Sequence, residues 1–173
     1  ADSDVKSATF SSVPELKKII STDKAPAAIG PYSQATVVGK TAYVSGCIAI
    51  IPGSSPPTLA EGGIEGQTRQ LLDNMKAVVE ACGGTMANVC KTTIFLHGDM
   101  SNCALRVSSN RKLQVLRGLP SILCARCHIV PVPIMNKIYA EYFPTNPPAR
   151  STIAVAGLPL GALIEIECIA ALE

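Results

Sequence analysis

Two segments near the C-terminus carry residues suited to binding an anion and moving a proton. Arg150 follows a Pro-Pro turn in residues 147–151, PPARS, and opens a predicted strand. A guanidinium held at that point could pair with both oxygens of a carboxylate, because its planar fork matches the carboxylate geometry. Spacing alone favours the simpler interpretation, which is a solvated arginine at the start of a strand.

Fifteen residues later, residues 164–167 have the sequence IEIE. Side chains alternate across a strand, so Glu165 and Glu167 point to one side and the two isoleucines point to the other. If the isoleucine side is core, a partly buried Glu165 could act as a general base or hold a water molecule. Residue type alone favours a solvated sheet edge.

Two further candidates lie in the N-terminal half. Tyr32 follows Gly30-Pro31, a pair typical of a sharp turn, and its phenol could orient a substrate or pack within the loop. Ser45 stands in residues 43–46, YVSG, and could line a pocket, although a single serine is a very weak signal. Neither residue indicates a reaction by itself.

The spacing of the cysteines and histidines does not indicate a disulfide framework or a metal site. The chain has seven cysteines at irregular spacings and enough length to bury a core, which favours small buried thiols in a reducing compartment. Residues 124–128, CARCH, match the short c-type haem attachment pattern, but their context is wrong and we attribute the match to chance. We expect no metal and no cofactor.

Hydrophobic periodicity and turn residues divide the chain into an α+β set of elements. Strands are expected at 17–21, 34–38, 41–50, 89–96, 151–156 and 162–172, and helices at 65–82 and 135–143. The second and third strands should form one hairpin and the last two strands another. Because strands and helices mix without strict alternation, each helix should lie on one face of a largely antiparallel or mixed sheet.

Composition limits the classes of function. The 173 residues are 47% hydrophobic, and 15 Lys plus Arg against 13 Asp plus Glu give a net charge of +2. So small a surplus is no general reason to bind nucleic acid or an anionic membrane, and no apolar run approaches the roughly 20 residues of a membrane span. We expect residues 1–14 to be a disordered polar tail before a single domain at 15–173. The absence of a signal pattern predicts a cytoplasmic protein, or a mitochondrial or plastid protein if a targeting segment preceded residue 1.

Residues 106–134 interrupt this domain with a different composition. They hold five basic residues and no acidic ones, so the remaining 10 basic and 13 acidic residues would carry a charge of −3. The segment is either a genuine basic insertion or an artefact, which would be a retained intron or an error in the gene model. The abrupt charge shift favours the second explanation, and so does the continuous sequence that results when residue 105 is joined directly to residue 135. Transcript sequencing or an intact mass would test it.

Several segments together resemble the RidA/YjgF family of reactive-intermediate (enamine/imine) deaminases. The matching text includes 20–35 (ISTDKAPAAIGPYSQA), 67–83 (QTRQLLDNMKAVVEACG), 135–143 (MNKIYAEYF) and the PPARS and IEIE segments. The resemblance covers nearly everything from residue 17 to residue 171 except 106–134. It implies a chorismate-mutase-like α+β domain with two helices on one face of a mixed sheet. It also implies a homotrimer whose clefts lie between subunits.

The resemblance assigns roles to individual residues. Arg150 matches the family's carboxylate-binding arginine and Glu165 matches the glutamate that positions the attacking water, so these two are the catalytic candidates. The residues that match substrate-binding positions are Tyr32, Ser45, Asn136 and Thr152. Some family members carry cysteine where Thr152 stands, and the insertion lies beside Asn136. The implied activity is that of a 2-iminobutanoate/2-iminopropanoate deaminase, which converts 2-aminoacrylate and related 2-imino acids to 2-oxo acids and ammonium without a cofactor.

Two other classes of function stay open. Some members of the family are described as ribonucleases or translation inhibitors, and the basic segment 106–134 favours RNA. The scarcity of aromatic residues and the charge of the remaining chain disfavour RNA. A non-catalytic ligand-binding or holdase-like trimer would instead bind 2-oxo acids at Arg150 without turnover. The sequence does not rank the imine substrates, because pocket size depends on the neighbouring subunit.

Overall fold

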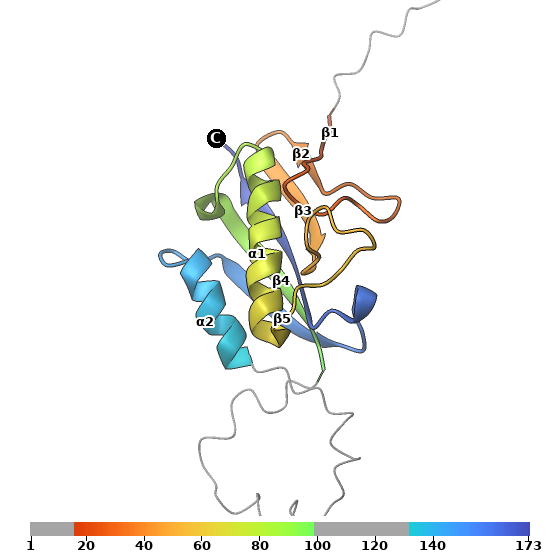
Figure 1. Cartoon of the computed structure of the whole chain (residues 1–173). Coiled ribbons are helices and arrows are strands. Elements are labelled where there is room, and N and C mark those ends of the chain that lie inside the picture. Colours follow the sequence, from red (N-terminus) through yellow and green to blue (C-terminus); the bar gives the residue numbers. More distant parts are fainter. Residues whose placement is uncertain (1–15, 99–131) are drawn as a thin grey trace, which may run out of the picture.

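The computed structural model describes residues 16–98 and 132–173, and in them one six-stranded sheet carries two α-helices on one face (Figure 1). The strands are β1 (Lys18–Ile20), β2 (Ala35–Val38), β3 (Thr41–Cys47), β4 (Val89–His97), β5 (Ala149–Val155) and β6 (Ile164–Ala171). The helices are α1 (Gly63–Ala81) and α2 (Val132–Tyr142), and the short 3-10 turns η1 (Met86–Asn88) and η3 (Pro159–Gly161) precede β4 and β6. The expected α+β class is confirmed.

The strands lie in the order β1-β2-β3-β6-β4-β5, and only β4 and β5 pair in parallel. The hairpin of β2 and β3 is confirmed, with Gly39 at φ 58° in its turn. The expected hairpin of the last two strands is wrong, because β4 lies between β5 and β6 and bonds to both. A parallel neighbour needs a crossover connection, and α2 provides one between β4 and β5.

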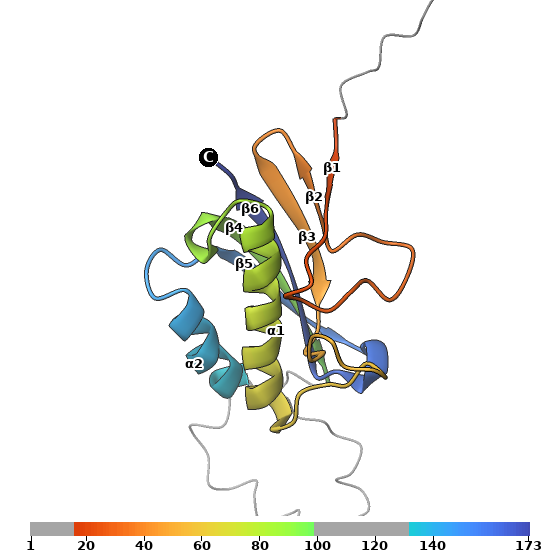
Figure 2. The same cartoon turned by 45° about the horizontal axis from the view of Figure 1, so that its top comes forward.

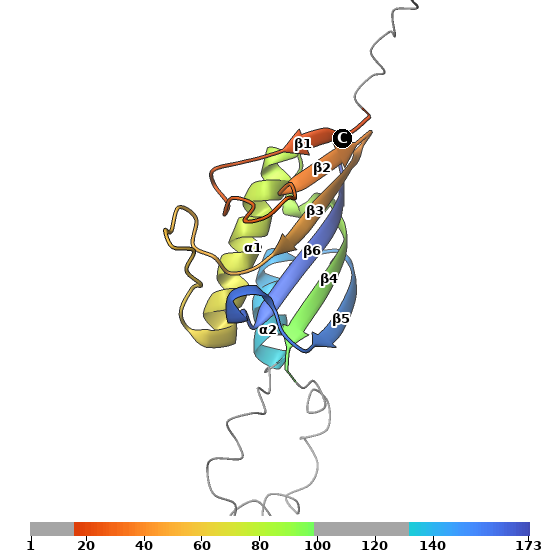
Figure 3. The ribbon, with the colours of Figure 1, turned by 90° about the vertical axis from the view of Figure 1, so that its right-hand side faces the viewer.

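The core lies between the sheet and the helices, which Figure 3 shows on the same side of the strands. The apolar stripe of α1, including Leu71, Met75 and Val78, is almost completely buried. It faces the inward side of the sheet, where Ile164 and Ile166 are fully buried. Burying each such side chain stabilises the fold by about 1.5–3 kcal/mol. The alternation in β6 leaves Glu165 and Glu167 on the face that no described helix covers, as the IEIE pattern predicted.

The start of α2 differs from the expectation. The helix begins at Val132, so the last three residues of the predicted insertion, 132–134, form its first turn beside α1 (Figure 2). Pro133 is tolerated there because the first turn needs no backbone N–H donor. The predicted tail 1–14, the CARCH segment and the rest of the predicted insertion lie outside the described residues.

The thiols in the described ranges are free, and their burial is uneven. Cys82 and Cys168 are buried and Cys47 is half-buried, as small core thiols should be. Cys90 is exposed, so the general expectation of buried thiols is wrong for this residue. It lies where the register of β4 on β6 shifts between Val89 and Lys91. No helix in the described ranges is long and apolar enough to cross a membrane.

Candidate functional site

The carboxylate of Glu165 rests on the backbone of Gly46. A Cβ added to Gly46 would lie 1.9 Å from Glu165 Oε1 and 2.8 Å from its Cδ, so the carboxylate occupies the space of the missing side chain. The register of β3 on β6 shifts between Val44 and Cys47, and irregularities of this kind often re-aim side chains beside functional sites. The sheet therefore presents Glu165 at the end of β3 beside a bare stretch of backbone.

Glu165 lines a hollow of about 440 Å³, which we call the Glu165 hollow. Its walls consist of Ile29, Tyr32, Ser45, Gly46, Ile48, Ile50, Pro159, Glu165 and Glu167. Ser45 Oγ donates to the Ser33 carbonyl at 2.6 Å, and the Ile29 N–H donates to Tyr32 Oη at 3.3 Å. The structure thus brings three predicted site residues, Tyr32, Ser45 and Glu165, to one place.

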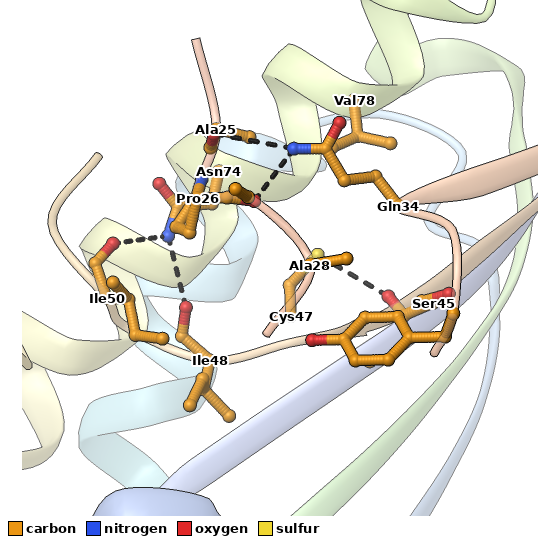
Figure 4. A pocket seen from close by; sticks show the side chains of 13 residues that line it. Ala25, Pro26, Ala28, Gln34, Ser45, Cys47, Ile48, Ile50, Asn74 and Val78 are labelled. Atoms are coloured by element: carbon orange, nitrogen blue, oxygen red, sulfur yellow. Dashed lines mark hydrogen bonds between the residues drawn. The ribbon is translucent and has the colours of Figure 1, made fainter. Parts of the chain in front are cut away.

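Two buried amides hold the loops around this hollow, and Figure 4 shows them lining a smaller cavity of about 50 Å³ that shares part of its wall. The Gln34 amide donates to the carbonyl of Pro26 at 2.7 Å, and its Oε1 accepts from the Thr22 N–H at 2.6 Å. Asn74 Nδ2 donates to the carbonyls of Ile48 and Ile50 at 3.1 and 2.8 Å. Buried amides with several partners order a loop, so the wall that carries Tyr32 is preformed.

Burial changes the proton affinity of the groups at this site. Removal from water raises the pKa of Glu165 above its ordinary value, and the nearby charge of Glu167 raises it further. A carboxylate with a raised pKa is a stronger base at neutral pH. Burial, with a smaller contribution from Glu165, also raises the pKa of the Cys47 thiol to about 12. Cys47 therefore stays protonated and is not an activated nucleophile.

The second group of predicted residues surrounds Arg150 on the edge strand β5. Arg150 Nη1 donates to Asn136 Oδ1 at 2.8 Å, and the guanidinium carbon lies 5.1 Å from the ring centroid of Tyr139. Thr152 lies two residues along β5 and is half-buried on the same face. Among the described residues no carboxylate forms an ion pair with the exposed Arg150, so its charge is available to an external anion.

One protomer does not bring the two groups together. Arg150 pairs with Thr92, whose side chain faces the helices, whereas Glu165 pairs with Phe95 on the opposite face. The two residues are separated by roughly 10 Å across the strands and roughly 10 Å along them, because two strand spacings and three residues lie between them. A small ligand cannot contact both residues of one protomer through the sheet.

Two important neighbours were not predicted as site residues. Tyr139 lies three residues after Asn136 on α2, and this helical spacing placed it near the same surface. Gly46 stands next to Ser45, but nothing in the sequence indicates that a carboxylate lies on its backbone. Within the described ranges no group of three His, Cys, Asp or Glu residues could hold a metal ion.

The chain is similar to known proteins along most of its length. The family model described as Endoribonuclease L-PSP matches residues 22–131 and 127–172. Reactive Intermediate Deaminase A, chloroplastic, of Arabidopsis thaliana is 38% identical over 156 residues, which are 90% of this chain and 66% of that protein. The human 2-iminobutanoate/2-iminopropanoate deaminase is 37% identical over 155 residues, which are 90% of each protein.

Solved structures agree with these matches. RidA from the Antarctic bacterium Psychrobacter sp. PAMC 21119 is 32% identical with a TM-score of 0.67, over 90% of this chain and 99% of that chain. Escherichia coli TdcF with bound serine is 29% identical with a TM-score of 0.66, over the same shares of the two chains.

Proposed function

Because this chain belongs to the endoribonuclease L-PSP (RidA/YjgF) family, we propose that it hydrolyses reactive 2-imino and enamine acids to 2-oxo acids and ammonium. The substrates proposed are 2-aminoacrylate, 2-iminopropanoate and 2-iminobutanoate. The observation that carries the proposal is the half-buried carboxylate of Glu165, which lies over Gly46 in the Glu165 hollow. Burial raises the pKa of this carboxylate. The names of the human and Arabidopsis relatives support the same reaction.

The reaction needs little covalent machinery. Solvent protonates the enamine at its methylene carbon and yields an iminium ion, whose carbon accepts a nucleophile. Glu165 takes a proton from a water molecule as that water attacks, and the carbinolamine formed then loses ammonia, which leaves as ammonium after taking up the proton. Arg150 binds the substrate carboxylate and holds the reacting carbon in place. No cofactor takes part in this scheme.

The opposite placement of Arg150 and Glu165 supports a site shared between protomers. In this proposal one protomer supplies Glu165, Tyr32 and Ser45. A neighbouring protomer supplies Arg150, Asn136 and Thr152. The family resemblance supports a homotrimer, in which the same contact would be repeated three times around an axis.

The face of the sheet that no described helix covers supports such an assembly. Large apolar side chains stand exposed on it, including Tyr43 at 48%, Ile153 at 46% and Ile169 at 38%. Large apolar side chains exposed on one face of a sheet favour burial of that face against a neighbouring protein. Glu165 lies on this face as well, so a neighbour that covers the apolar side chains would also approach the Glu165 hollow.

A complementation experiment tests the reaction and the shared site together. We would prepare Arg150→Ala and Glu165→Gln proteins, each expected to be inactive, then unfold and refold them as an equal mixture. If each site takes Glu165 from one protomer and Arg150 from another, about a quarter of the sites in random trimers hold both native residues. The mixture should therefore recover about a quarter of the wild-type rate of ammonium release.

Controls separate the possible outcomes. Sedimentation must show that each variant is a folded trimer, and each variant refolded alone must stay inactive. An inactive mixture with an active, refolded wild type would place both residues in the same protomer, and a single variant that keeps its activity would remove that residue from catalysis. An inactive but trimeric wild type that binds 2-oxobutanoate would indicate a non-catalytic binding protein. The RNA alternative rested on the basic segment, most of which lies outside the described residues.

A further inference from the structure

Tyr139 lies directly beneath the guanidinium of Arg150. Its ring centroid is 5.1 Å from the guanidinium carbon, and its side chain is only 5% exposed. Tyr139 Oη and Thr92 Oγ1 form a buried hydrogen bond of 2.7 Å. The ring also packs on Phe143, with 4.6 Å between the two centroids. The hydrogen bond to Thr92 and the contact with Phe143 therefore both favour the position of the ring beneath Arg150.

This arrangement controls the conformation of a side chain that is otherwise free. An exposed arginine loses much rotamer entropy when it binds an anion, and that loss weakens binding. The face of an aromatic ring attracts a guanidinium, and the Asn136 amide accepts from one of its N–H groups at 2.8 Å. Together the two contacts leave the guanidinium ordered, with its remaining N–H groups available to a carboxylate.

We infer that Tyr139 is a positioning residue that holds the Arg150 guanidinium ready for the carboxylate of a small 2-imino or 2-oxo acid. Thr92 acts one step further away, since its hydroxyl keeps the Tyr139 ring in place. The inference deepens the proposed function and rests on it, because it assumes that Arg150 binds the substrate carboxylate. Arginine is required at this position, since lysine offers neither a planar group to lie on the ring nor a fork for two oxygens.

Binding of 2-oxobutanoate to the full-length protein tests the inference without requiring turnover. Calorimetry should show that Tyr139→Leu weakens binding about 5- to 30-fold, which corresponds to the loss of a partly desolvated cation–π contact. Tyr139→Phe keeps the ring and should weaken binding less than about 3-fold. Phe143→Leu is the matched control, because in the described part of the chain Phe143 packs on Tyr139 without a cation–π contact to Arg150. It should weaken binding far less than Tyr139→Leu, because the ring stays beneath Arg150 and the Thr92 hydrogen bond still holds it.

Kinetics and a double-mutant cycle distinguish positioning from a general structural role. Tyr139→Leu should raise KM for the imine and leave kcat nearly unchanged, because Glu165 is untouched. In an Arg150→Ala background the same substitution should have no further effect on binding. Equal weakening by Tyr139→Leu and Phe143→Leu, or a wild-type Kd for Tyr139→Leu, would overturn the inference.

A spectroscopic measurement keeps the inference separate from the proposed function. Protons that lie over an aromatic ring are shifted upfield in the NMR spectrum, so the side-chain signals of Arg150 should move downfield in Tyr139→Leu and not in Phe143→Leu. If the folded wild type binds no 2-oxobutanoate, the proposed carboxylate role of Arg150 fails. If the Arg150 signals do not move in Tyr139→Leu, the positioning contact is absent and the inference fails by itself.

Discussion

Replacing Gly46 by alanine should inactivate the protein while leaving its fold intact. The added Cβ would lie 1.9 Å from Glu165 Oε1, whereas ordinary contacts begin at about 3.4 Å, so the oxygen must move by about 1.5 Å. The Cδ and Cγ atoms of Glu165, at 2.8 and 3.1 Å, would be pushed in the same direction. A displacement of about 1 Å in a catalytic group costs on the order of 100-fold in rate. We expect kcat to fall at least that far.

The backbone itself tolerates the change. Gly46 does not adopt the left-handed conformation that favours glycine, so alanine introduces no strain of its own. Gly157→Ala is the matched control, because a Cβ there meets no atom within 4 Å. Both variants should keep the unfolding midpoint of the wild type to within a few degrees at a fixed protein concentration. Binding of 2-oxobutanoate should also persist, since Arg150 belongs to the other group.

The assay generates a 2-imino acid enzymatically and lets semicarbazide compete with hydrolysis for it. Faster hydrolysis lowers the yield of semicarbazone, and the ratio of the two reports kcat/KM. Glu165→Asp should partly relieve Gly46→Ala, because the shorter side chain withdraws the carboxylate by about the required distance. The double variant should therefore lose less than the product of the two single losses. A Gly46→Ala protein with wild-type kcat would refute the idea that this glycine positions Glu165.

Two further predictions follow from the raised pKa of Glu165. Glu167→Gln removes the second cause of that rise, so the acid limb of the pH profile of kcat/KM should move to lower pH. Lys91→Gln, which removes a charge of opposite sign from the same open face, is the comparison. An acid limb that moves to higher pH or stays in place in Glu167→Gln would exclude Glu165 as the titrating base. Because the folded pKa exceeds the unfolded one, the ionised carboxylate destabilises the fold at pH 7, and this cost disappears as the pH falls below the ordinary value of about 4.5. Glu165→Gln should therefore raise the unfolding midpoint at pH 7 and have little effect at pH 3.5, and an unchanged midpoint at pH 7 would contradict the burial of a charge at this position.

Local patterns in the sequence predicted the elements and the faces they present. The stripe of α1 and the alternation of β6 each depend on neighbours two to four positions apart, which a linear sequence displays directly. The same alternation predicted that Glu165 stands away from the core. The family resemblance then selected Arg150 and Glu165, which spacing alone had left as surface residues.

Long-range pairing was beyond this kind of prediction. The short connection through 157–159 indicated a hairpin of β5 and β6, but β4 lies between them and pairs with both strands. A register of this kind depends on contacts between distant segments, and each contact must offset its own loop-closure entropy. Periodicity within a strand carries no information about which other strand it pairs with.

The sequence by itself determined the α+β class, the amphipathic α1, the outward face of Glu165 and the family of the chain. Only the tertiary structure decided that Glu165 rests on Gly46, that Arg150 lies over Tyr139, and that the two groups occupy opposite faces of one sheet. The physical reason is the range of the interactions. Side-chain direction within an element is set by backbone geometry over a few residues, whereas the meeting of two side chains is set by strand order, register and packing across the whole domain.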